Sequence, residues 1–474
     1  MQETPKFVMA AVSMHGCVKN CENKYVVTDS ILTCSFRNGA LIAAGTVFLT
    51  QGVLWASHLI NNFDRHGSLP WAGYFLQIYG GYFLLDFMIL LYCLSCRIWH
   101  AFGIDYAAVF SDYSYDCLDW RQVAELPCWS YFLLGLTLSM NFYYTRNDTI
   151  YEYYPALLIG LSTMVGFIPF RMCYYASRMW LLTSLRRVCL AGMYQVEWWD
   201  IYVADMLCSL TYSTGNISMF FCLYVQSWNS PEKCDSSHSR MLGFMTALPS
   251  IWRTLQCIRR YWDTNHESIH LLNGGKYMLT VSFYIALSAY RIHQTFPNRL
   301  SFIILAIVNS SVSCFWDVCH DWGLGKPHVR YPFLRRDLRF TSPWIYYAAI
   351  LVNTLLRFTW IFYIVIPQQL QHSAVTSFGV SVGEVCRRGL WSLFRIENEY
   401  CSRIDSVEEI EVSSHRSWPF SKLPHTEAND RYSSNPIKLH YRNPTYTDDA
   451  LIEGKSNARC AYSPLAVPKD VFSS

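Results

Sequence analysis

Long apolar runs between residues 39 and 396 constrain the fold of this chain more than any other feature. Each run is long enough for a helix that crosses the roughly 30 Å of hydrocarbon in a lipid bilayer. Because a spanning segment must satisfy its own backbone hydrogen bonds, we expect the runs to be helical. They lie at about 39–60, 71–96, 127–145, 153–171, 199–226, 241–258, 275–292, 300–321, 343–366 and 375–396. The sequence therefore predicts an all-α, polytopic membrane protein of about ten transmembrane helices.

The composition supports this class and argues against others. Of the 474 residues, 52% are hydrophobic and only 15% are charged. That balance is typical of a protein embedded in a lipid bilayer rather than of soluble domains. The net charge is +3, and no dense run of Lys and Arg could follow a phosphate backbone, so we expect no binding of nucleic acid.

The 18 cysteines predict neither a disulfide framework nor a metal centre. The pairs Cys17/Cys21 and Cys93/Cys96 lack a second ligand pair at zinc spacing. Other cysteines lie inside apolar runs, where Cys acts as a small hydrophobic residue, and these include Cys208, Cys222 and Cys314. The sequence also has no P-loop, dinucleotide fingerprint or evident nucleophile and base pair, so we expect no enzymatic activity and no cofactor.

Basic residues on the connecting segments predict the orientation of the chain. When the N-terminus is placed in the cytosol, Lys and Arg are in excess on the cytosolic side, as the positive-inside rule requires. An even number of spans then makes both termini cytosolic. The sequon Asn147-Asp148-Thr149 falls on the opposite side, after the third run. Asn147 is therefore a predicted glycosylation site.

The chain divides into four predicted segments. Residues 1–37 form a cytosolic N-terminal segment, 38–198 hold the first four spans and an amphipathic linker, and 199–400 hold the last six spans. Residues 401–474, rich in Ser, Pro, His and Asp, form a disordered cytosolic tail. Within the tail, 443–446 and 462–465 resemble tyrosine-based sorting signals, which predicts trafficking adaptors as partners.

Ionisable side chains recur in all of the last six predicted spans. An arginine at the centre of a membrane helix costs roughly 2.5–3.5 kcal/mol on an insertion scale, so Arg357, inside VNTLLRFTWIFYIV, needs partners. The available cations are Arg253, Lys276, Arg357, Arg387 and Arg388, and the acids are Asp205, Asp317, Asp321 and Glu384. Because separate exposure to lipid would be too costly, we expect these groups to converge inside the bundle.

The guanidinium group of arginine binds tetrahedral oxyanions in a bidentate manner, and nearby acids offset the positive charge of the empty site. The converging charges therefore predict a pathway for an oxyanion. For any single residue, a helix-to-helix ion pair or snorkelling to the interface is an equal alternative. Trp360, one turn from Arg357, is either an aromatic constriction or ordinary packing. An intramembrane aspartyl protease built on Asp205 and Asp317 is disfavoured, because the usual glycine-rich context is missing.

Five ordered blocks make the chain similar to a known family. LPSIWRTLQCIRRYWDT, HLLNGGKY, SCFWDVCHDWGL, LLRFTW and EVCRRGLWSLFRIENE closely resemble signature blocks of the EXS family. This family includes phosphate exporters of the retrovirus-receptor type and the fungal ER-retention-defective Golgi type. The likeness runs from about Phe36 to Glu399. It implies a ten-span, often dimeric protein that moves inorganic phosphate through a pore built by its last six helices, the six-helix EXS pore core.

The resemblance also implies roles for single residues. Trp360 matches the position thought to gate the pore, while Asp321 and Glu384 match charge partners. Cys208 stands where animal members carry Asn, a departure that removes one polar contact. The positions that match pore or phosphate-contacting residues are Asp205, Arg253, Lys276, Tyr277, Asp317, Arg357, Arg387 and Arg388.

Family exporters usually carry a Lys-rich SPX domain before the first span, whereas only about 37 residues precede it here. Members without this domain are like the Golgi type, which returns luminal phosphate to the cytosol. The resemblance therefore favours a Golgi membrane, with the plasma membrane as the alternative. A second hypothesis is a Golgi sorting or retention scaffold for glycosyltransferases and ER-resident proteins.

Overall fold

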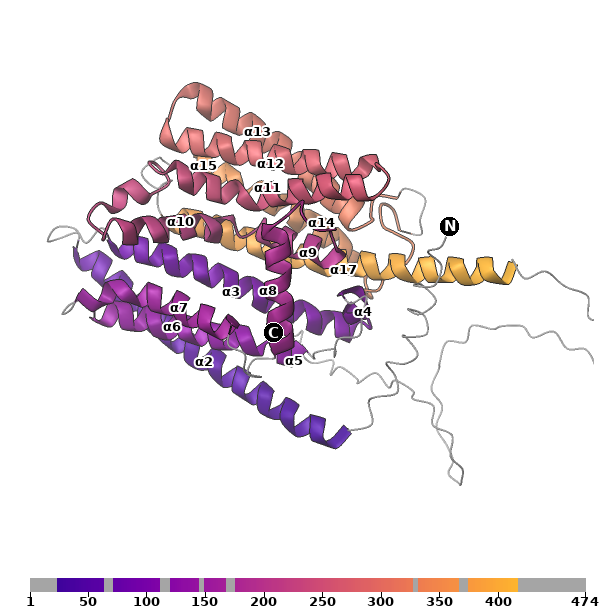
Figure 1. Cartoon of the computed structure of the whole chain (residues 1–474), viewed down its shortest axis with the longest axis horizontal. Coiled ribbons are helices and arrows are strands. Elements are labelled where there is room, and N and C mark those ends of the chain that lie inside the picture. Colours follow the sequence, from indigo (N-terminus) through magenta and orange to yellow (C-terminus); the bar gives the residue numbers. More distant parts are fainter. Residues whose placement is uncertain are drawn as a thin grey trace, which may run out of the picture. The chain divides into compact units, whose positions relative to one another are not determined.

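The computed structural model describes residues 24–63, 71–110, 120–144, 149–167, 175–326, 331–365 and 374–416. Within these ranges every regular element is helical (Figure 1), which confirms the all-α prediction. The described residues up to His415 belong to one unit of contacts. Asn147 and both tyrosine motifs of the tail lie outside the described residues, so their roles stay predictions.

The first half of the chain builds a group of helices that run in the same direction in Figure 1. Its elements are α2 (Lys24–Phe63), α3 (Trp71–Ala101), α4 (Tyr106–Phe110), α5 (Trp120–Val123), α6 (Glu125–Tyr144), η2 (Thr149–Tyr153) and α7 (Tyr154–Phe167). The strongest packing in this group is between α2 and α6, whose backbones approach closely at Gly45 and Gly135. The boundary predicted at residue 37 falls inside α2.

Helix α8 (Tyr175–Cys189) corresponds to the amphipathic linker and crosses the direction of α3 in the view of Figure 1. The buried guanidinium of Arg178 donates from Nη1 to the carbonyl oxygens of Val165 and Gly166. Arg187 donates from Nε to Asp200 Oδ2 at 2.8 Å. These contacts fix α8 against the helices on either side of it in the sequence.

The second half of the chain contains helices that are more often interrupted. Its last helix passes the domain boundary predicted at residue 400 and continues to Arg416. The main elements are α9 (Trp198–Leu207), α10 (Thr211–Val225), α11 (Arg240–Asp263), α12 (Ser268–Ile292), α13 (Phe296–Trp316), α14 (Pro343–Arg357), α15 (Phe362–Val365) and α17 (Ala374–Arg416).

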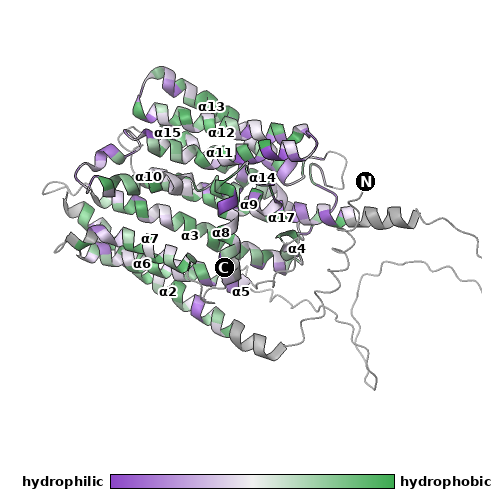
Figure 2. Cartoon of the chain, viewed as in Figure 1, coloured by the Kyte–Doolittle hydropathy of each residue, from purple (hydrophilic) through white to green (hydrophobic). Residues whose placement is uncertain are grey.

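Five helices of the described chain are long and apolar enough to cross a membrane, and the protein is a membrane protein. They are Leu32–Ile60, Ala72–Ala101, Trp120–Tyr143, Phe296–Asp321 and Pro343–Val365. Figure 2 shows hydrophobic residues along these helices and more hydrophilic residues in α11 and α12. The remaining predicted spans are shorter, interrupted or richer in charge, so the count of ten stays a prediction.

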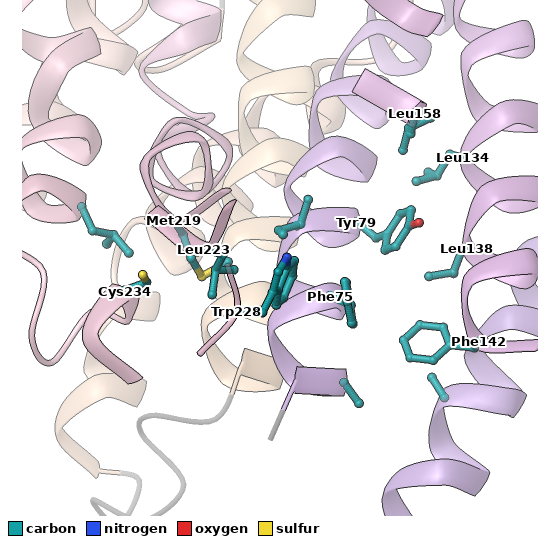
Figure 3. Packing of buried hydrophobic residues seen from close by; sticks show 14 residues of the cluster. Phe75, Tyr79, Leu134, Leu138, Phe142, Leu158, Met219, Leu223, Trp228 and Cys234 are labelled. Atoms are coloured by element: carbon teal, nitrogen blue, oxygen red, sulfur yellow. The ribbon is translucent and has the colours of Figure 1, made fainter. Parts of the chain in front are cut away.

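One hydrophobic cluster joins the two halves (Figure 3). The rings of Phe75 on α3 and Trp228, just after α10, lie 4.4 Å apart between centroids. Trp228 reaches this position through a tight turn in which its own φ is 59°. Nearby, Cys222 forms a disulfide with Cys234. The prediction that Cys222 acts only as a small hydrophobic residue is therefore wrong, because the chain folds back after α10.

Candidate anion-binding site

Three predicted spans are interrupted at the same region of the bundle. The fifth breaks at Cys208–Leu210, between α9 and α10. The eighth ends in a π-helical turn, η4 (Asp317–Asp321), and the ninth breaks after Arg357 into the 3-10 turn η5 (Thr359–Ile361). Non-helical backbone at membrane depth is tolerated where it lines a cavity or is buried in protein. The interruptions therefore mark this region as a candidate site.

A cavity of about 280 Å³ lies where these interruptions meet, and it supports the predicted convergence of charges. Its wall includes side chains from α3, α10, α11, α12, α13, α14 and α17. The predicted site residues that line it are Lys276, Tyr277, Asp317, Asp321, Arg357, Trp360, Glu384 and Arg388. Asp205, Arg253 and Arg387 do not line the cavity, and each lies behind its wall.

The cavity follows α12 over a long distance. Both Lys276, near the start of the helix, and Arg291, in its last turn, line it. Fifteen residues separate these two positions, which at 1.5 Å per residue is roughly 22 Å along the helix axis. One end is deeply buried, since Asp317 is 1% exposed, whereas Arg291 at the other end is partly exposed.

Asp317 joins two of the predicted arginines at the buried end. Its Oδ2 accepts from Arg357 Nη2 at 2.7 Å and from Arg387 Nη1 at 3.2 Å. Arg387 also donates from Nη2 to Glu384 Oε1 at 2.6 Å. Asn353 completes the group, because its amide donates to Asp317 at 3.3 Å and accepts from Arg387 at 3.1 Å. The guanidinium of Arg387 is thus held by protein partners on several sides.

Asp205 and Arg253 form a second, separate ion pair. Arg253 Nε donates to Asp205 Oδ1 at 2.7 Å, and Arg253 Nη1 donates to Gln256 at 2.7 Å. The Tyr277 hydroxyl donates to the same Asp205 oxygen at 2.5 Å. Both charged side chains are almost fully buried. A buried pair with its hydrogen bonds satisfied has little residual capacity for a ligand.

Lys276 and Arg388 differ from the other cations. Neither has a carboxylate within 4 Å in the part of the chain that the structure describes, although they are only 8% and 6% exposed. Lys276 Nζ lies 4.2 Å from the ring centroid of Tyr277. Arg388 lies 4.4 Å from that of Trp391 and donates from Nε to Ser209 Oγ at 2.8 Å. A buried cation that no carboxylate contacts directly creates a favourable position for an anion.

Trp360 lies in η5, between the interrupted halves of the ninth span, and lines the cavity. Its ring packs edge-on against Phe302 with centroids 6.1 Å apart, and it is 8% exposed. It is therefore both packed and positioned at the cavity, and the two alternatives from the sequence are compatible.

Sequence reasoning did not assign several residues of this site. Ser209 connects Arg388 to Glu384, because its hydroxyl donates to Glu384 Oε1 at 2.7 Å. Gln256 follows Arg253 by three residues on α11, so helical spacing could have found it. Asn353 precedes Arg357 by four residues, and this spacing aligns the two on the ninth span. Arg291 gave no comparable signal.

Taken together, the fold and the charged cavity define a helical membrane protein with a buried site suited to an anion. Residues 75–401 match the EXS family, and the chain belongs to that family. The resemblance found in the sequence is thereby confirmed.

Relatives of this chain come from fungi, plants and mice. The chain is 36% identical over 369 residues to Protein SYG1 homolog of Schizosaccharomyces pombe, covering 77% of this chain and 52% of the relative. It is 33% identical over 356 residues to Protein SYG1 of Saccharomyces cerevisiae, covering 69% and 39%. With Phosphate transporter PHO1 homolog 10 of Arabidopsis thaliana it shares 30% identity over 362 residues, covering 72% and 46%. The chain spans about half the length of these relatives.

Proposed function

We propose that this protein carries inorganic phosphate across a membrane through the charged cavity. The observation that carries the proposal is the pair of buried cations, Lys276 and Arg388, which line the cavity without a carboxylate within 4 Å in the described chain. The name of the plant relative, a phosphate transporter, supports phosphate as the anion. No enzymatic step is part of the proposal.

The two cations have complementary chemistry for a tetrahedral anion. The planar guanidinium of Arg388 can offer two parallel N–H donors, while Lys276 acts as a compact point charge. The paired arginines behind them, Arg253 and Arg387, hold the wall in place instead of binding the anion directly. Asp321 and Glu384 also line the cavity, so their negative charge weakens anion binding enough for release.

The location of the protein in the Golgi membrane, and the side of that membrane that each end of the cavity faces, are part of this proposal. The loop that contains Cys234 borders the partly exposed end of the cavity through Asp235, Ser236 and Ser237. Disulfides form and persist in oxidising compartments, which supports a luminal position for this end. The protein would then return luminal phosphate to the cytosol, with both termini cytosolic.

Phosphate flux into proteoliposomes tests the proposal. We expect the unmodified protein to carry radiolabelled phosphate, and Lys276→Ala and Arg388→Ala each to reduce the initial rate by about tenfold or more, the effect of losing one charged contact. Arg186→Ala is the matched control, because Arg186 is exposed on α8 and does not line the cavity. Flux at the unmodified rate in both cavity variants would remove the proposed site. An excess of sulfate in the same assay measures selectivity between oxyanions.

A further inference from the structure

The partly exposed end of the cavity contains a cation that the buried site does not use. Arg291 lines the cavity from the last turn of α12. Its guanidinium carbon lies 5.2 Å from the ring centroid of Tyr363. In the part of the chain that the structure describes, no carboxylate lies within 4 Å of Arg291. Within the described residues, Arg291 therefore packs on an aromatic face and has no carboxylate in direct contact.

The groups around Arg291 are suited to an oxyanion. The hydroxyl side chains of Ser236, Ser237 and Ser288 line the same end of the cavity. The acid at this end, Asp235, is engaged within its own loop, since its Oδ1 accepts from the Ser237 amide at 2.8 Å and lies 3.0 Å from His238 Nδ1. Hydroxyl groups and one cation thus line this end of the cavity, where the acid is engaged within its own loop.

The walls of this end are fixed in position. A methyl group in place of the hydrogen of Gly243 would collide with the Ser288 hydroxyl, so α11 and α12 approach closely here. The loop that supplies Ser236 and Ser237 follows Cys234, which the disulfide joins to α10. Trp228 anchors the start of the same loop against Phe75 (Figure 3). The hydroxyl groups are therefore presented by a constrained segment.

The order of residues along the interrupted ninth span relates this end to the buried site. Arg357 lines the cavity at the buried end, and Trp360 follows three residues later. Tyr363, whose ring contacts Arg291, follows after three more residues. Trp360 consequently separates the two cationic regions along the cavity wall.

We propose that Arg291, with the hydroxyl group of Ser288, forms an outer subsite that holds phosphate before it passes Trp360 to reach Lys276 and Arg388. The inference rests on the proposed function and deepens it. A charge at a cavity mouth with low-dielectric walls raises the local concentration of an oppositely charged substrate, and this effect decreases with ionic strength. Arg291 would therefore govern loading at low phosphate rather than the maximal rate.

The test measures the initial rate of phosphate influx into proteoliposomes at increasing external phosphate. For Arg291→Ala we expect the half-saturating concentration to rise by about three- to tenfold, with the maximal rate retained. Arg291→Lys keeps the charge and should stay within about twofold of the unmodified protein. The matched control is Arg299→Ala, because Arg299 is exposed just beyond the same end of α12 and does not line the cavity.

The outcomes separate this inference from the proposed function. If the unmodified protein and Arg299→Ala transport phosphate and Arg291→Ala has an unchanged half-saturating concentration, the outer subsite is refuted while phosphate transport stands. If Arg291→Ala shows the rise but 0.5 M NaCl does not reduce the difference, the steering argument is wrong. If the unmodified protein carries no phosphate, the proposed function fails and the subsite fails with it.

Discussion

Arg388 donates from Nε to the hydroxyl oxygen of Ser209 at 2.8 Å, which orients the guanidinium while its two terminal nitrogens have no carboxylate within 4 Å in the described chain. Ser209 in turn donates to Glu384 at 2.7 Å. A single hydroxyl therefore joins an acid and a cation that the sequence places four residues apart on α17. The Ser209 hydroxyl therefore orients both side chains, while the positive charge of Arg388 is not neutralised by a direct carboxylate contact.

Replacing Ser209 with Ala should impair phosphate transport through this geometry. Arg388 would keep its charge but lose the contact that orients it, and a hydrogen bond to a charged group contributes about 1.5–3 kcal/mol. We expect a loss of roughly tenfold in the ratio of maximal rate to half-saturating concentration. Ser209→Thr retains the hydroxyl and serves as the control. Equal flux for Ser209→Ala and the unmodified protein would show that the contact is dispensable.

The Asp205–Arg253 pair should contribute mainly to stability. Removing one member leaves a buried charge without its partner, which costs about 3–5 kcal/mol. We expect Asp205→Asn or Arg253→Gln to lower the thermal unfolding midpoint in nanodiscs. The double variant should lose less stability than the sum of the losses in the two single variants. The exposed pair Arg259–Asp263, 3.0 Å apart, is the comparison. Its disruption should change stability by less than about 1 kcal/mol.

An additive double variant would contradict this assignment. So would a stability loss at Arg259 as large as the loss at Arg253.

Trp360→Ala should increase phosphate flux if Trp360 restricts the cavity. The indole fills part of the cavity wall and packs against Phe302, so its removal widens the passage past η5. We expect the basal rate in proteoliposomes to rise by roughly twofold or more, as for removal of a hydrophobic constriction. Trp360→Phe, which retains an aromatic ring, should stay near the unmodified rate. A reduced rate in Trp360→Ala with intact folding would argue instead for a packing role.

The Cys222–Cys234 disulfide can be checked chemically. In denatured protein, the peptides that contain Cys222 and Cys234 should be alkylated only after reduction. Cys234→Ser should also destabilise the protein by about 2–4 kcal/mol, because the disulfide closes a short loop in the unfolded chain. Cys128→Ser provides the comparison, since Cys128 is buried and free. Identical alkylation with and without reductant would show that the two thiols are not joined.

Much of the helical framework could be predicted because its cause is local. An apolar run of sufficient length must form a helix in a bilayer, whatever its neighbours are. The interruption at Cys208–Leu210 could not be predicted in the same way, since no Pro or Gly stands there. At this interruption Leu210 packs in a buried cluster with Leu84 of α3 and Val385 of α17, contacts that spacing along the chain does not show. The same holds for the turn that brings Trp228 onto Phe75 and Cys234 onto Cys222.

The sequence by itself determined that this is a helical membrane protein of the EXS family with many charges inside its spans. Only the tertiary structure decided which of these charges neutralise one another. Asp317 pairs with Arg357 and Arg387, which lie 40 and 70 residues away, and this leaves Lys276 and Arg388 facing the cavity. The physical reason is that the energy of a buried charge depends on partners within a few ångströms, and helix packing, not spacing along the chain, sets those distances.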